Sequence, residues 1–150
     1  MYSRLWRQNG NDMNELQLKM CDIQGRLFEL SGAAGYDSAT FIKAFMTSEV
    51  AKGLDSKFNR MQWAGEEYLL AELADNAEFT KGGTVYDKEV LYWAGYLYRF
   101  WHFSTGENSK TIYRQASAET MKRNFLIFHS LSPEAAIEDL KEIYRQRSDG

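Results

Sequence analysis

Arg99 and His102 are ionisable residues within the most apolar segment of the chain, which runs from residue 90 to residue 103 of a helix predicted over residues 86–103. Aromatic and aliphatic residues of this segment fall on every face of an α-helix. A helix of that kind is expected in the centre of a core or beneath a partner. Burying an unpaired guanidinium is costly, so Arg99 requires a carboxylate, a ligand or a route to solvent.

The preceding predicted helix offers three acidic partners for Arg99, namely Glu66, Glu67 and Glu72. An ion pair between Arg99 and one of these glutamates would lock the two helices together, and this is the structural prediction. The functional alternative is that Arg99 forms part of a ligand or partner site.

A second pair, Arg123 and His129, resembles the arrangement in HEPN ribonucleases, where a histidine follows an arginine and a polar residue on one helix. Such a pair can stabilise a phosphorane and move a proton while a 2′-hydroxyl cleaves RNA. The two positions lie about 240° apart around an ideal helix, so they share a face only if the helix bends or ends between them. Otherwise His129 is a capping or packing residue at a helix end.

The residues for other site chemistries are missing from the sequence. Two histidines and one cysteine form no metal-ligand cluster of recognised spacing, so we expect no metal and no cofactor. The chain has no phosphate loop, dinucleotide fingerprint or nucleophile elbow. A net charge of −3 argues against nucleic acid as the main partner, because phosphate recognition usually requires a basic surface.

Aromatic residues make up 15% of the chain, a high share for a domain of this size. A small helical domain is not expected to enclose all of them, and Tyr, Trp and Arg together are typical of interface hot spots. Some members of one group should therefore reach the surface: Tyr92, Tyr96, Tyr98, Trp101, Phe103 and Tyr113. The alternative is that they all fill the core.

Hydrophobic spacing predicts an all-α, single-domain bundle of six or seven helices around the central aromatic helix at residues 86–103. The chain has one proline to interrupt helices and no sustained period-two alternation. We expect an N-terminal arm at residues 1–11 and a helical domain at residues 12–150. The predicted helices begin near residues 12, 38, 58, 86, 109, 117 and 133.

A short pattern occurs twice, thirty residues apart: WAG at residues 63–65 precedes Tyr68, and WAG at residues 93–95 precedes Tyr98. Small residues let helix backbones approach closely, so one prediction is that the two helices cross at these positions. The alternative is chance recurrence.

The sequence favours a cytoplasmic location. A single cysteine permits no internal disulfide, and residues 1–11 lack the apolar core of a signal peptide. The longest apolar stretch, residues 90–101, contains Arg99 and is shorter than the ~20 residues that cross a bilayer.

Several segments resemble a family of small uncharacterised helical proteins from gut-type Firmicutes, encoded in loci that look like toxin–antitoxin modules, some beside an ADP-ribosyltransferase-like toxin gene. The likeness extends over roughly residues 12–145 and lies in the order and spacing of seven segments: 41–46, 54–55, 62–70, 93–101, 109–113, 128–131 and 135–137.

The resemblance implies an antitoxin or accessory subunit that binds a toxin-like protein and is not itself an enzyme. Seven residues are the candidates for partner or ligand binding: Glu67, Trp93, Tyr98, Arg99, Trp101, Tyr113 and His129. Arg123 does not belong to the family pattern, which weakens the ribonuclease alternative.

A third reading is a sensor in which Arg99 and aromatic residues line a cavity for a small anionic or nucleotide-like ligand. The chain could also form homo-oligomers.

Overall fold

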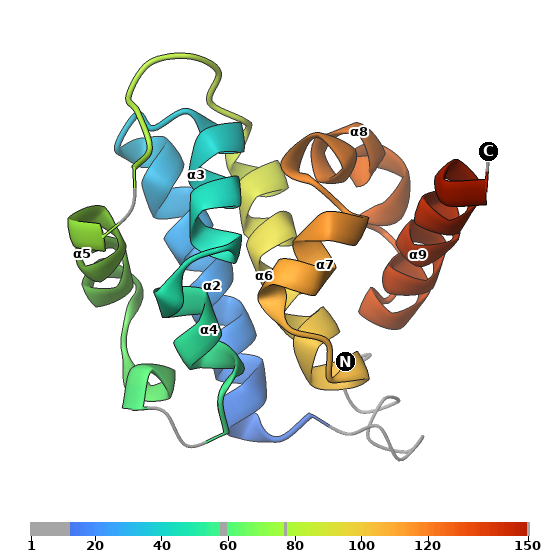
Figure 1. The fold of residues 1–150 in the computed structure, drawn as a ribbon, viewed down its shortest axis with the longest axis horizontal. Coiled ribbons are helices and arrows are strands. Elements are labelled where there is room, and N and C mark those ends of the chain that lie inside the picture. The colour runs from blue at the N-terminus through green and yellow to red at the C-terminus, as the bar shows by residue number, and fades with distance from the viewer. Residues whose placement is uncertain (1–12, 58–59, 77, 150) are drawn as a thin grey trace.

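The computed structural model describes residues 13–57, 60–76 and 78–149, and within these ranges the chain is an all-α bundle, as predicted (Figure 1). The predicted arm at residues 1–11 lies outside the described residues. Eight α-helices and one 3-10 turn are described: α2 (Glu15–Ala33), α3 (Ser38–Met46), α4 (Glu49–Asp55), η1 (Arg60–Trp63), α5 (Glu66–Asn76), α6 (Lys88–Thr105), α7 (Ser109–Gln115), α8 (Ala118–Phe128) and α9 (Pro133–Asp149).

The structure has one α-helix more than the seven predicted starts because the helix that begins at Ser38 ends at Met46 and a separate helix, α4, follows it. Ser48 caps α4, its hydroxyl accepting a hydrogen bond from the Ala51 amide. The helix predicted over residues 58–74 is replaced by η1 and α5, which are separated by Ala64 and Gly65.

Side-chain caps fix most of the helix starts. Asn14 and Gln17 form a capping box before α2, close to the helix start predicted near residue 12. Asn108 caps α7, and this leaves the predicted cap, Ser109, free to turn its hydroxyl into the core. Ser117 caps α8 as predicted.

Helices α2 and α6 form the central pair of the bundle and make its most extensive helix–helix contact. A Cβ atom on Gly95 would lie 2.5 Å from the Gln24 carbonyl oxygen and 2.9 Å from the Gly25 Cα atom. Gln24 also donates a side-chain hydrogen bond of 2.9 Å to the Gly95 carbonyl. Glycine at position 95 is therefore what allows the two backbones to meet.

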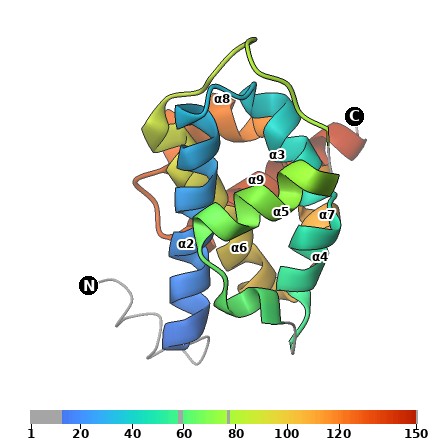
Figure 2. The same cartoon turned by 90° about the vertical axis from the view of Figure 1, so that its left-hand side faces the viewer.

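The second WAG sequence thus marks a helix crossing, but its partner is α2. Gly65 precedes α5 and faces open space, and Trp63 is 76% exposed. Helix α5 lies across α2 and α4, as Figure 2 shows. The predicted crossing of the two WAG segments is therefore wrong.

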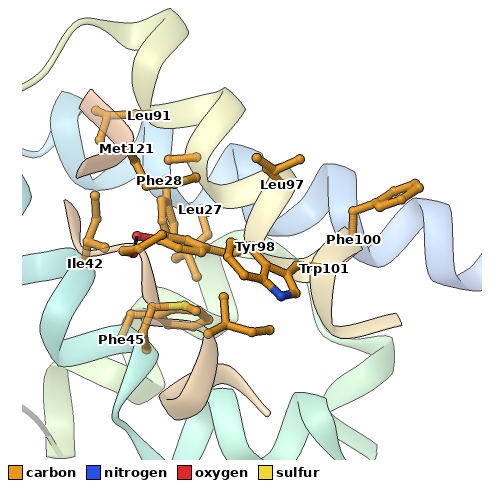
Figure 3. Close-up of a cluster of buried hydrophobic side chains, with 14 of the residues drawn as sticks. Leu27, Phe28, Ile42, Phe45, Leu91, Leu97, Tyr98, Phe100, Trp101 and Met121 are labelled. Carbon is orange, nitrogen blue, oxygen red and sulfur yellow. Dashed lines mark hydrogen bonds between the residues drawn. The ribbon is translucent and has the colours of Figure 1, made fainter. Parts of the chain in front are cut away.

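The remaining helices enclose α6 on its other side: α7, α8 and α9 all pack against it (Figure 1). Five of the buried side chains of α6 are Leu91, Leu97, Tyr98, Phe100 and Trp101. Tyr98 points toward Phe28 in the core, whereas Phe100 points to the other side of the helix (Figure 3). The predicted central aromatic helix is confirmed. No helix in the described part of the chain is both long and apolar enough to cross a membrane.

The close contact at Gly95 predicts that Gly95→Ala lowers the free energy of unfolding by about 1–3 kcal/mol, because the new methyl group meets backbone atoms that can move only if α2 and α6 separate. Urea denaturation measures the change. The matched control is Gly65→Ala, which places the same methyl group in open space and should change stability by no more than ~0.5 kcal/mol. Equal stability of the two variants would contradict the assigned crossing.

Candidate functional site

Arg99 is 1% exposed and lies at the centre of a polar cluster that joins four helices. Its Nε atom donates to Gln24 Oε1 on α2 at 2.8 Å, and its Nη2 atom donates to Ser109 Oγ on α7 at 3.1 Å. Its Nη1 atom forms a 2.6 Å ion pair with Asp55 Oδ1, at the last residue of α4. The buried charge is thus neutralised and hydrogen-bonded inside the fold.

Asp55 completes this cluster by binding the start of α7. Its Oδ2 atom accepts a hydrogen bond from the Ser109 amide, and its Oδ1 atom accepts one from the Ser109 hydroxyl, both at 2.8 Å. The sequence predicted a carboxylate for Arg99 correctly, but Asp55 fills that role. Glu66 and Glu67 lie instead at the start of α5, on the far side of α2.

His102 lies one helical turn beyond Arg99 and is largely buried. Its Nδ1 atom is 2.6 Å from the Glu107 carbonyl oxygen, which can only accept, so Nδ1 carries the proton. Burial lowers the pKa of His102. The hydrogen bond to Glu107 offsets only part of this lowering, and the neighbouring Arg99 charge lowers the pKa further. The ring is therefore neutral at pH 7 and serves as a structural donor.

A second polar cluster surrounds the Glu107 carboxylate. It accepts hydrogen bonds from Trp101 Nε1 at 2.8 Å, Lys141 Nζ at 2.8 Å and Gln115 Nε2 at 2.7 Å. Burial alone would raise the pKa of Glu107, but these hydrogen bonds, with one from Thr105, lower it to about 2. Helices α6, α7 and α9 are joined at this carboxylate.

Three of the seven predicted binding residues, Tyr98, Arg99 and Trp101, therefore lie in the interior. The Tyr98 hydroxyl donates a 2.6 Å hydrogen bond to the Ala116 carbonyl, and burial raises the pKa of that hydroxyl well above its usual range. Because α7, α8 and α9 cover this face of α6, these side chains have no direct access to a partner in this conformation. Of the six aromatic residues of which some were expected to reach the surface, Tyr98 and Trp101 are buried, and the other four are partly exposed: Tyr92, Tyr96, Phe103 and Tyr113.

Trp93 and His129, two other predicted residues, meet in a surface depression of about 620 Å³ between α6, α8 and the start of α9, here called the aromatic hollow. Its lining combines rings with aliphatic side chains, chiefly Tyr92, Trp93, Tyr96, Leu97, Phe125, Leu126, His129, Leu131 and Pro133.

Ring contacts hold the floor of the aromatic hollow in place. Trp93 meets Phe125 edge to face with ring centroids 5.7 Å apart, and Phe125 stacks on His129 at 4.4 Å. His129 Nδ1 is 2.7 Å from the Phe125 carbonyl oxygen, so this histidine is both a helix-end residue and a wall of the hollow.

Two exposed leucines, Leu126 and Leu131, line the hollow, and Ile127, next to Leu126 on α8, is also exposed. Leu126 is 79% exposed, Ile127 is 69% exposed and Leu131 is 37% exposed. The sequence prediction missed these exposed residues, because it used only Met121, Phe125 and Phe128 as the apolar stripe of the helix that begins near residue 117. Leu126 and Ile127 fall outside that stripe, and apolar residues on the polar side of a helix are the signal that could have identified this surface.

The other predicted residues lie elsewhere. Glu67 lines a neighbouring hollow over α2, whereas Tyr113 is half-buried on α7, where burial raises the pKa of its hydroxyl. Arg123 faces a third depression, beside Tyr86 and Glu119. Arg123 and His129 therefore do not share a hollow within one copy of the chain.

Other chemical groups contribute little to a catalytic site. Across the described ranges, no group of three or more His, Cys, Asp or Glu residues could hold a metal ion. Cys21 is fully buried, and burial raises the pKa of its thiol to about 12, so it is protonated at neutral pH.

Comparison of the chain with family models, with curated proteins and with solved structures gave no match. The resemblance to the toxin–antitoxin-associated family is therefore still an expectation. Function has to be inferred from the geometry of the two polar clusters and the aromatic hollow.

The buried ion pair predicts that Asp55→Ala lowers the free energy of unfolding by about 3–5 kcal/mol, because it leaves the Arg99 charge buried without a counterion. Chemical denaturation followed by circular dichroism checks this. The control is Glu142→Ala, which removes an exposed ion pair with Arg145 and should leave the midpoint unchanged. Similar denaturation midpoints for the two variants would show that the Arg99–Asp55 ion pair does not stabilise the fold.

The Glu107 cluster predicts a pH-dependent contribution to stability. The folded-state pKa of about 2 lies below the usual 4.5, so the contribution is complete above pH 4.5 and is lost as the pH falls toward 2. The free energy of unfolding of the wild type should exceed that of Glu107→Gln at pH 7, and the difference between the two proteins should be smaller at pH 3. Urea titrations of both proteins at the two pH values measure it, and a gap that stays constant would refute the assignment.

Proposed function

We propose that this chain is a non-enzymatic protein that binds a partner protein through the aromatic hollow, as an antitoxin or accessory subunit binds a toxin. The observation that carries the proposal is the exposure of Leu126 and Leu131 at the lining of a ring-lined depression. Contiguous apolar surface with a polar rim is typical of interaction sites. Burying a leucine or isoleucine side chain of this kind contributes ~1.5–3 kcal/mol.

The polar clusters support this proposal by making the hollow rigid. Arg99 and Trp101 lie on the inner face of α6, and their hydrogen bonds to α2, α4 and the α6–α7 loop fix the helix whose outer face carries Trp93. A surface that is already ordered loses less entropy on binding. We therefore assign Arg99 and Trp101 a positioning role and Trp93 and His129 a contact role.

The two alternative functions have less support. A ribonuclease would need Arg123 and His129 in one site, and these residues line different depressions. A sensor of anionic ligands would need an accessible guanidinium at Arg99, and that group is enclosed and bound to Asp55.

The test is co-expression of the chain with the product of the adjacent gene, measured by co-purification and by rescue of growth. Leu126→Asp should weaken binding at least about tenfold and abolish rescue, because it puts a charge in the apolar contact. Leu126 is exposed, so this variant should keep the wild-type fold.

The matched control is Trp63→Ser, which removes a large exposed apolar side chain outside the aromatic hollow and should bind like wild type. Loss of binding in Trp63→Ser with full binding in Leu126→Asp would place the interface elsewhere and overturn the proposal.

A further inference from the structure

The aromatic hollow continues into a second depression over α2 and the N-terminal ends of α5 and α6, here called the acidic hollow. Its volume is about 870 Å³, and Glu29, Lys88 and Tyr92 line both depressions. One groove therefore changes along its length from mainly aromatic at Trp93 to mainly charged at Glu67.

Negative charge predominates along this groove. Five carboxylates and two cationic side chains line the groove, which gives it an excess of three negative charges. The carboxylates are those of Asp22, Glu29, Glu66, Glu67 and Glu89, and the cations are Arg26 and Lys88. Arg26 is already paired with Asp22, at 3.0 Å. All these residues are exposed or partly exposed, so their field reaches a molecule lying in the groove.

Tyr92 marks the junction between the two parts of the groove. Its hydroxyl donates a 2.6 Å hydrogen bond to Asp22, which fixes the ring, and its centroid lies 6.0 Å from that of Tyr96. An immobilised aromatic face beside carboxylates is a favourable place for a lysine or arginine side chain, through cation–π attraction and charge pairing.

We infer that the occupant of this groove is a basic amphipathic segment of the partner protein, with apolar side chains in the aromatic hollow and lysines or arginines over the acidic hollow. This inference rests on the proposed function and adds the chemistry of the partner. Charge complementarity selects this occupant. A second copy of the chain, with its net charge of −3, and a nucleic acid would both bring negative charge to a negative face.

The experiment measures binding of three labelled synthetic peptides of equal length by fluorescence anisotropy. The first has an apolar block of Leu and Trp followed by a basic block of Lys and Arg. The second has Glu in place of every basic residue, and the third has Ser in place of every apolar residue. The full chain should bind the first peptide and neither of the others, and added salt should weaken that binding.

Two variants locate the basic block. Glu29→Gln with Glu67→Gln should weaken binding of the first peptide about tenfold, because the pair removes two of the facing charges. Glu142→Gln removes an exposed carboxylate on α9, outside the groove, and should leave binding unchanged. Equal weakening by both changes would mean diffuse attraction to an acidic protein and would overturn the inference.

The failure of this inference can be told apart from failure of the proposed function. If Leu126→Asp abolishes binding of the native partner while the Glu29→Gln, Glu67→Gln variant binds that partner normally, the hollow binds a partner that is not basic. In that case the inference fails and the proposed function stands. If sedimentation shows a dimer that Leu126→Asp dissociates, the groove binds a second copy and both are overturned.

Discussion

Burial of one guanidinium constrains the whole arrangement. Arg99 lies in a helix that is otherwise apolar on its inner face, and its charge is stable there only while a carboxylate remains within contact. Asp55 supplies that carboxylate, and it can do so only if α4 ends where α7 begins. Gln24 adds a third fixed point on α2. The positions of four helices are thus tied to one side chain.

The same helix has two faces with different tasks. Its inner face holds Arg99 and Trp101, which hydrogen bonds to neighbouring helices immobilise. Another side of the helix holds Trp93, which packs against Phe125 of α8 and lines a groove on the surface. Rigidity on the inside favours binding on the outside, because a preformed groove has little side-chain freedom left to lose. In the proposed function, buried Arg99 does not contact the partner, and it contributes to binding only by holding α6 in place.

Polar groups along α6 fix how this helix is aligned with its neighbours. A helix bundle can slide along its apolar stripes with small loss of contact, whereas hydrogen bonds with short, directed geometry cannot be shifted without leaving buried groups unpaired. The Glu107 carboxylate accepts hydrogen bonds from Trp101, Gln115 and Lys141 at once, and the Gln24 side chain donates one to the Gly95 carbonyl. These contacts set the register between α6 and its neighbours.

The sequence by itself determined the all-α class, the central place of residues 86–103 and the need of a buried Arg99 for some compensating group, because periodicity and the cost of burying charge are local or general properties. It could not determine that Asp55, rather than Glu67, meets Arg99, or that Gly95 meets α2. Those pairings join residues tens of positions apart and depend on how helices cross. Which rings of α6 face solvent was decided by the packing of α7, α8 and α9, so only the tertiary structure placed Trp93 in a groove and Trp101 in the core.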